Sequence, residues 1–156
     1  MPQRTLVLLD NIRSAYNVGA IFRTCDGAGV EALYLVGYTP TPRDRFGRQQ
    51  PEIHKTSLGA SDIVPWQQCT NEAAVELIRT QQVNGYTVVA VEQTATALSL
   101  PDWQPPESVL YIFGNEIDGV AAPLLKAADV HIQIPMHGQK ESLNVSVAAG
   151  IVLYHS

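Results

Sequence analysis

The sequence predicts an α/β protein built on a parallel β-sheet. Short apolar runs typical of buried strands alternate along the chain with longer stretches that have helical spacing of apolar residues. Such alternation indicates strands joined by crossover helices that cover both faces of a parallel sheet. The segments after the strands hold most of the glycines, isolated carboxylates and small polar residues. Because ligands of such sheets bind beyond the carboxyl ends of the strands, we expect the functional site there.

The first third of the chain predicts strand, helix, strand and a long loop. TLVLLD (5–10) is a short apolar run stopped by Asp-Asn, as in a buried strand. Residues 17–29 predict a helix, because apolar side chains recur at helical spacing and Gly29 can end it. EALYLVG (31–37) predicts a second strand. Residues 38–55 hold three prolines and no apolar period, so we expect a long loop with a function.

The middle of the chain continues the alternation. Residues 71–85 form the clearest amphipathic pattern of the chain, and Asn84-Gly85 is a typical helix ending. YTVVAVE (86–92) predicts a strand, and the Pro-rich stretch 100–108 predicts a connector. VLYIFG (109–114) predicts a further strand after this connector.

The last quarter predicts a short helix, a strand and a terminal helix. Residues 121–129 tolerate Pro123 only if it lies in the first helical turn, and VHIQIP (130–135) predicts the last strand. QKESLNVSVAAGIVLYHS (139–156) reads as a helix that is apolar nearly all round, with polar groups only in its first turn. A surface helix would show a single apolar stripe, so we expect this helix to be buried on every side.

Composition and charge limit the class of protein. The 156 residues fit one domain, 1–156, and 46% hydrophobic against 16% charged residues suggests surface covered by a second copy. A net charge of −5 gives no global attraction to nucleic acid but leaves room for a local basic patch. The cysteines lack metal or redox spacing, and the N-terminal apolar run is too short for a signal peptide or a membrane span. We therefore expect a cytoplasmic protein.

Several familiar catalytic patterns are missing. The chain has no G-x-x-x-x-G-K-[ST], no G-x-G-x-x-G after its first strand and no G-x-S-x-G. Its histidines are scattered, so no metal is expected; they are His54, His131, His137 and His155.

Two glycine-containing loops are more informative. FGNEIDG (113–119) places Glu116 between two glycines after a strand, either as a solvated carboxylate in a tight connection or beside a ligand. IPMHGQKESLN (134–144) is a second such loop, and Ser142 either belongs to a site or caps the following helix. Side by side, the two loops would offer backbone groups to a flat polar ligand such as an adenine.

The segment 17–30 contains two further polar candidates. Asn17 and Arg23 are six residues apart and do not share a helix face, but a helix entrance at Asn17 would let both face one cleft. Arg23 interrupts an apolar run, so it either extends past core residues to solvent or points into a pocket.

Three segments together resemble the SpoU (TrmH-like) branch of the SPOUT RNA methyltransferases. They are NVGAIFRTCDGAGV (17–30), LYIFGNEIDGV (110–120) and IQIPMHGQKESLNVSVAAG (132–150), in the family's order, and KTSLGASDIVPW (55–66) also fits. The resemblance covers essentially the whole chain. It implies methyl transfer from S-adenosylmethionine to a ribose 2′-hydroxyl of tRNA or rRNA. It also implies the SPOUT fold, with a deep C-terminal trefoil knot around the cofactor and a terminal helix packed against a second subunit.

Matching by motif position implies the site residues. The implied catalytic set is Asn17, Arg23, Glu116, Ser142 and Asn144. The implied cofactor-binding set is Val91, Glu92, Gly114, Asn115, Ile134, Met136, Ser142 and Leu143. The family's proposed proton acceptor is the arginine, but guanidinium groups do not deprotonate in proteins. We expect Arg23 to hold the adjoining phosphate and stabilise the developing alkoxide, while Asn144 and Ser142 orient the substrate and Glu116 fixes local geometry.

The departures from the family pattern fall at packing positions. They are Cys25, Gly27, Ala28 and Gly150. They bear on the subunit interface rather than on the chemistry.

Basic residues predict where RNA binds. Arg43, Arg45, Arg48 and Lys55 lie on the long loop, with Arg13 at another strand end. They form either a phosphate-binding rim or an ordinary solvated loop. The chain resembles the minimal single-domain members of the family, whose targets include the wobble ribose of tRNA. We therefore expect a homodimer that acts on tRNA rather than rRNA. Two rivals are a non-catalytic knotted RNA-binding protein and a base methyltransferase.

Overall fold

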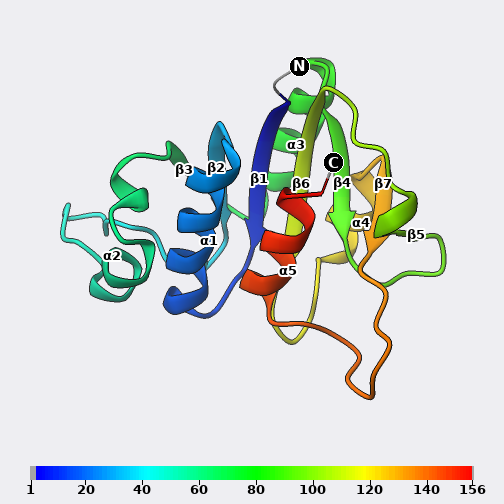
Figure 1. Cartoon of the computed structure of the whole chain (residues 1–156). Helices are drawn as coiled ribbons and strands as arrows, with labels where there is room; N and C mark the ends of the chain where they lie inside the picture. The colour runs from blue at the N-terminus through cyan, green and yellow to red at the C-terminus, as the bar shows by residue number, and fades with distance from the viewer. Residues whose placement is uncertain (1–2, 156) are drawn as a thin grey trace.

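A seven-stranded parallel sheet forms the centre of the computed structural model, which describes residues 3–155 (Figure 1). The strand order is β3-β2-β1-β6-β4-β7-β5, and every neighbouring pair is parallel. The strands are β1 (Arg4–Asp10), β2 (Ala32–Val36), β3 (Trp66–Cys69), β4 (Thr87–Val91), β5 (Leu98–Ser99), β6 (Ser108–Gly114) and β7 (Val130–Gln133). The predicted α/β class with a parallel sheet is confirmed. The trefoil knot stays a prediction.

Helices cover both faces of the sheet. They are α1 (Ala15–Ala28), α2 (Pro51–Ser57), α3 (Ala74–Val83), α4 (Ala122–Ala127) and α5 (Val145–Leu153), with 3₁₀ turns at Ala60–Asp62 and Leu100–Asp102. In Figure 1, α1, α2 and α5 lie on the viewer's side of the sheet and α3 and α4 lie behind it. No helix formed by residues 3–155 has the length and apolar character that a membrane crossing needs.

Alternate residues of the central strands pack into two separate cores. In β1, Val7 and Leu9 join the core under α1 and α5, whereas Leu6 and Leu8 join the core under α3 and α4. This follows from the two-residue period of a strand. Strands buried on both faces must be apolar at every position, which explains the continuous apolar runs in the sequence.

Helix α1 is positioned by its two ends. The Ser14 hydroxyl accepts a hydrogen bond from the Asn17 backbone N–H (3.1 Å), so the helix begins two residues earlier than predicted. Gly29 ends it with a φ of 75°, a left-handed conformation that glycine adopts without steric cost. The capped start of α1 therefore lies directly beyond the carboxyl end of β1.

The structure corrects three expectations about individual elements. Part of the predicted loop 38–55 is helical, since α2 begins at Pro51. A proline is tolerated there because it lies in the first turn of the helix. Strands β3 and β5 were missed; both are short, and β3 reads WQQC with its glutamines exposed. The terminal helix begins at Val145 rather than at residue 139, so residues 134–144 are an extended loop.

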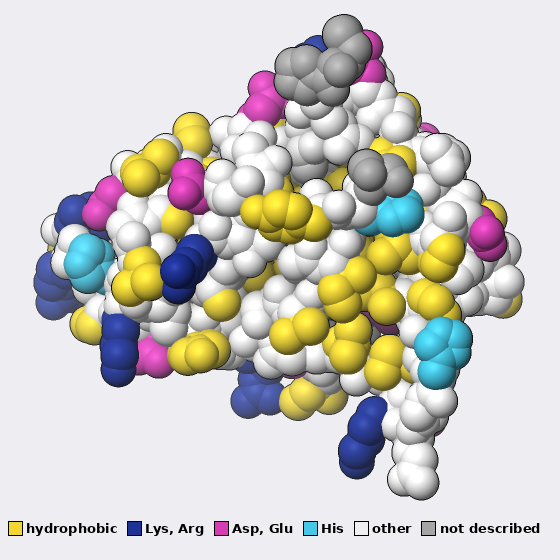
Figure 2. All heavy atoms as spheres, viewed as in Figure 1, with side chains coloured by type: hydrophobic (Ala, Val, Ile, Leu, Met, Phe, Trp, Pro, Cys, Tyr) yellow, Lys and Arg dark blue, Asp and Glu magenta, His cyan; other side chains and the backbone are white. Residues whose placement is uncertain are grey.

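Within the single chain, α5 is not buried on every side. Val145, Ala149 and Val152 face the core, whereas Val147 is 51% and Ile151 is 41% exposed. Figure 2 shows hydrophobic side chains gathered over α5 on this face of the molecule. Burial by a second copy, as expected from the sequence, stays a prediction.

Candidate functional site

A pocket of about 550 Å³ opens beyond the carboxyl ends of three neighbouring strands, β4, β6 and β7. Its walls come from residues 91–94, residues 113–120 and the segment 133–148. These are the segments that follow the three strands, where the sequence predicted the site. The last segment runs from β7 into the first turns of α5.

The glycines of the β6–α4 loop form one wall of this pocket. A side chain on Gly114 would overlap the backbone of Gly119 and Val120. Gly119 has a φ of 73°, and a side chain there would overlap the Glu92 carboxylate. The Glu92 carboxylate instead accepts a hydrogen bond from the Val120 N–H (2.8 Å). Only glycine fits at either position, so the loop can close tightly.

Asn115 holds this loop against the ends of two other strands. Its Oδ1 atom accepts hydrogen bonds from the N–H groups of Ile117 and Asp118, both at 2.8 Å. Its Nδ2 atom donates to the Asn11 carbonyl and to the Tyr38 hydroxyl, also at 2.8 Å. The side chain is fully engaged within the protein, so any contact of Asn115 with a ligand falls to its backbone.

Glu116 ties the loop to the start of α1. Its carboxylate accepts hydrogen bonds from the N–H groups of Arg13 (2.8 Å) and Ser14 (3.0 Å), and from the Asn17 side chain (3.1 Å). Desolvation raises the pKa of Glu116, but these hydrogen bonds outweigh it and hold the pKa below its ordinary value. The charged form is therefore favoured by folding, and its contribution is lost only as the pH falls through the lowered pKa.

The pocket lining is acidic. Four carboxylates line it, Glu92, Glu116, Asp118 and Glu141, and among residues 3–155 no lysine, arginine or histidine does. Such a lining attracts a cationic ligand and repels phosphate groups. It therefore disfavours a nucleoside triphosphate as the occupant.

The segment before α5 forms the opposite wall. Asn144 caps α5, because its Oδ1 atom accepts hydrogen bonds from the Ser146 N–H (2.9 Å) and hydroxyl (2.6 Å). The alternative that Ser142 caps this helix is therefore wrong. Ser142 is exposed and lines the pocket, and the predicted apolar contacts Ile134, Met136 and Leu143 line it as well.

Residues that sequence reasoning missed also shape the pocket. Gln93, Thr94, Asp118 and Leu125 line it. His131 Nε2 donates to the Leu125 carbonyl (2.8 Å), and the Thr94 hydroxyl lies 2.9 Å from His131 Nδ1. His131 therefore links two parts of the wall. Its place between two apolar residues of a strand gave no signal of this contact.

The structure brings most of the predicted catalytic residues together but leaves Arg23 apart. Asn17 is buried against Glu116, while Ser142 and Asn144 lie across the pocket. Arg23 is exposed and does not line the pocket. It lies six residues beyond Asn17, which is about 9 Å along the axis of α1.

The predicted RNA-binding residues are all exposed. Arg43, Arg45 and Arg48 lie in one turn between β2 and α2, and Lys55 lies on α2. Arg13 lies at the start of α1, beside Glu116. Their contact with RNA stays a prediction.

Known proteins share this architecture. The 23S rRNA (guanosine-2′-O-)-methyltransferase RlmB of Neisseria meningitidis is 32% identical over 148 residues, which are 95% of this chain and 56% of that protein. The tRNA (guanosine(18)-2′-O)-methyltransferase of Aquifex aeolicus is 31% identical over 97% of this chain and 67% of its own length. The AdoMet-bound rRNA methyltransferase from Sinorhizobium meliloti superposes with a TM-score of 0.85 at 31% identity, covering 99% of this chain and 56% of that one.

This chain thus spans little more than half the length of several of these relatives. The family model described as the SpoU rRNA Methylase family matches residues 4–154, which contain every strand and α-helix of the described residues 3–155 and the whole pocket. The chain therefore belongs to the SpoU rRNA methylase family.

Proposed function

We propose that this protein is an S-adenosylmethionine-dependent RNA methyltransferase that methylates a ribose 2′-hydroxyl. The observation that carries the proposal is the acidic, glycine-walled pocket at the strand ends of a chain in this family. A volume of about 550 Å³ lies within the range of small-molecule and cofactor sites. The relatives from Neisseria meningitidis and Aquifex aeolicus are named 2′-O-methyltransferases of rRNA and tRNA, respectively.

The residues of the pocket fit the cofactor. S-adenosylmethionine supplies an activated methyl group on a positively charged sulfonium. Four carboxylates around the pocket suit that charge, and Ile134, Met136 and Leu143 offer an apolar surface to an adenine ring. Val91, Gly114 and Met136 line the pocket, and the absence of a side chain at Gly114 lets a ligand approach the backbone closely.

The other polar residues would position the RNA. Ser142 and Asn144 lie at the mouth of the pocket, where they can orient the attacking hydroxyl. Glu116 and Asn17 fix the start of α1 relative to that mouth. Arg23 would hold the neighbouring phosphate and stabilise the alkoxide that develops on the ribose oxygen. These intact polar residues favour an enzyme over a non-catalytic RNA-binding protein.

We further propose a homodimer in which Arg23 serves the pocket of the other copy. Val147, Ile151 and Tyr154 expose an apolar surface along α5 (Figure 2), and such a surface favours burial against a partner. Helix α1 packs beside α5, with Thr24 adjacent to Gly150, so Arg23 lies next to this surface. A second copy bound to this surface would lie close to Arg23, whereas the pocket of the chain that carries Arg23 does not include it.

Product analysis tests the reaction. The protein is incubated with methyl-labelled S-adenosylmethionine and either total tRNA or rRNA, and the RNA is then digested to nucleosides. We expect label in a 2′-O-methylated nucleoside, with tRNA as the preferred substrate and rRNA as the second candidate. Label in a methylated base would contradict ribose methylation. Absence of label in both RNAs, with the cofactor bound, would support the non-catalytic alternative.

A further inference from the structure

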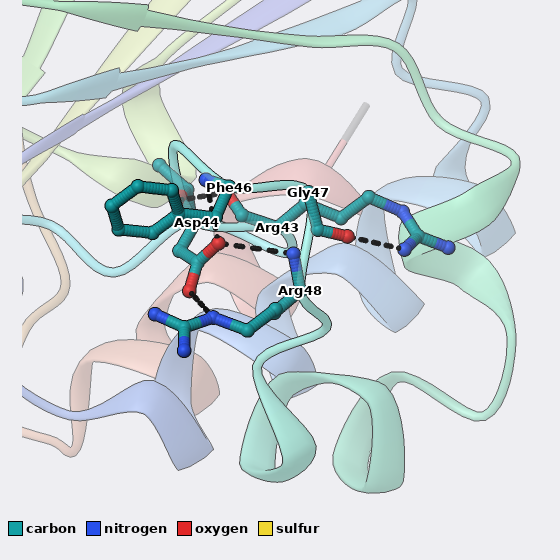
Figure 3. Close-up of polar contacts among 6 residues, drawn as sticks. Arg43, Asp44, Phe46, Gly47 and Arg48 are labelled. Carbon is teal, nitrogen blue, oxygen red and sulfur yellow. Dashed lines mark hydrogen bonds and ion pairs between the residues drawn. The ribbon is translucent and has the colours of Figure 1, made fainter.

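The exposed turn between β2 and α2 is linked internally by its own hydrogen bonds (Figure 3). Asp44 Oδ1 accepts hydrogen bonds from the N–H groups of Phe46 (2.9 Å) and Arg48 (3.0 Å), and Oδ2 accepts from Arg48 Nε (2.8 Å). Arg43 Nη1 donates to the Gly47 carbonyl (3.0 Å). The Arg48 backbone N–H leads the contacts that lower the pKa of Asp44. We call residues 43–49 the arginine turn.

An aromatic ring stands at the tip of the arginine turn. Phe46 is 67% exposed and contributes to neither core of the protein. The guanidinium carbons of Arg45 and Arg48 lie 4.8 and 5.0 Å from its ring centroid. Nucleobases stack on aromatic rings and on guanidinium planes, so an exposed ring flanked by two arginines suits an RNA base.

A second hollow of about 270 Å³ adjoins the arginine turn. Its lining is mostly polar and includes Tyr38, Thr41, Asp44, Arg48, Gln49 and Gln68. Glutamine amides offer both donors and acceptors, which suits the hydrogen-bonding edge of a nucleobase. We call this hollow the side pocket.

The side pocket is joined to the main pocket by one hydrogen bond. Tyr38 lines the side pocket, and its hydroxyl accepts from Asn115 Nδ2 (2.8 Å). Asn115 in turn lines the main pocket. The two hollows are therefore neighbours at the same edge of the sheet, one acidic and the other flanked by arginines.

We propose that the arginine turn and the side pocket bind an unpaired nucleotide of the RNA next to the one that is methylated. The base stacks on Phe46, the phosphates contact Arg45 and Arg48, and glutamine amides of the side pocket meet the base edge. The inference rests on the proposed function in taking RNA as the ligand and in placing the methylated nucleotide at the main pocket. It requires single-stranded RNA, because bases in a duplex are stacked on one another and closed to side chains.

Two oligonucleotide probes of equal length separate the contribution of base stacking to RNA affinity from that of backbone charge. One probe is a fluorescent single-stranded oligoadenylate, and the other has the same backbone with abasic sites. We expect the wild-type protein to prefer the oligoadenylate by about tenfold, in line with the contribution of one stacked base. Phe46→Ala should lose this preference while its affinity for the abasic probe is unchanged, and Phe46→Trp should keep the preference. Anisotropy titrations measure both affinities.

A matched control is available in Ile63→Ala, since Ile63 is also apolar and 67% exposed. It should leave both affinities unchanged. Equal affinity of the wild type for the two probes would overturn the proposal, as would a parallel loss for both probes in Phe46→Ala. A wild type that binds neither probe would also overturn it and would favour a protein partner at this surface.

The outcome is independent of the test of methyl transfer. Phe46 does not line the main pocket, so the Phe46→Ala protein should bind S-adenosylhomocysteine like the wild type. Methylation without a base preference would refute the nucleotide subsite but leave the proposed reaction intact. A base preference lost in Phe46→Ala, without any methylation, would support the subsite and refute the reaction.

Discussion

Gly114→Ala is expected to weaken the binding of S-adenosylhomocysteine by about a hundredfold, a loss of ~3 kcal/mol. The new methyl group would overlap the backbone of Gly119 and Val120. These atoms cannot withdraw freely, because Asn115 and Gly119 exchange two backbone hydrogen bonds (3.0 and 2.9 Å) and Val120 is held by Glu92. The pocket wall would therefore have to open. Calorimetric titration measures the change in affinity.

Gly138→Ala is the matched control for this change. Gly138 lies in the loop between β7 and α5, and a side chain there would meet open space. We expect its affinity to stay within about twofold of the wild type, which is less than 0.5 kcal/mol. Leu143→Asp, at an exposed position of the pocket wall, provides a second test if Gly114→Ala does not fold. A folded Gly114→Ala protein with wild-type affinity would contradict the assignment of this pocket.

Arg23→Ala is expected to reduce methyl transfer by about a thousandfold, because it removes the charge proposed to stabilise the alkoxide. Cofactor affinity should stay within about threefold, since Arg23 does not line the main pocket. Rates of methyl transfer under saturating cofactor and titrations with S-adenosylhomocysteine separate the two quantities. Arg79→Ala, at an exposed arginine of α3 on the opposite face of the sheet, should change neither. Equal losses of rate and of cofactor affinity in Arg23→Ala would refute its proposed role.

Mixing the Arg23→Ala and Gly114→Ala variants, at a cofactor concentration too low to fill the Gly114→Ala pocket, tests whether Arg23 acts on the other subunit. In a hybrid of Arg23→Ala and Gly114→Ala chains, the intact pocket faces an intact Arg23 only if the arginine crosses the interface. Random exchange should then restore roughly one quarter of wild-type activity, because half of the dimers are hybrids with one working site. No recovery after exchange would mean that Arg23 serves its own chain, or that the chains do not pair.

The sequence predicted best the elements whose apolar pattern is dictated by burial. Strands β1, β4 and β6 are buried on both faces, so their sequences are continuous apolar runs, which are typical of a buried strand. Strand β3 lies at the edge of the sheet, where exposure removes the apolar signal. The same reason hid β5, which has only two residues. Helix α2 was not predicted, because a proline such as Pro51 indicates a loop unless it is known to lie in the first helical turn.

For the site, the sequence predicted which segments meet but not how single side chains are used. The rule that ligands bind at strand ends placed the glycine loops at one edge, and the family motifs named their residues. Only the structure shows that Asn144 rather than Ser142 caps α5, because either residue type can cap a helix. The contact of His131 with Thr94 depends on pairing between distant strands, and the remoteness of Arg23 from the pocket depends on how far it lies along α1.

The most direct test is a calorimetric titration of the wild-type protein with S-adenosylhomocysteine, with ATP as the comparison ligand. The pocket predicts micromolar or tighter binding of S-adenosylhomocysteine, which keeps the adenosine and amino-acid parts of the cofactor, at one site per chain. Its acidic lining predicts affinity for ATP at least about tenfold weaker, because the phosphates are repelled. No detectable binding of S-adenosylhomocysteine by a folded, dimeric protein would contradict the account. The chain would then be better explained as an RNA-binding protein that keeps the family's fold without its reaction.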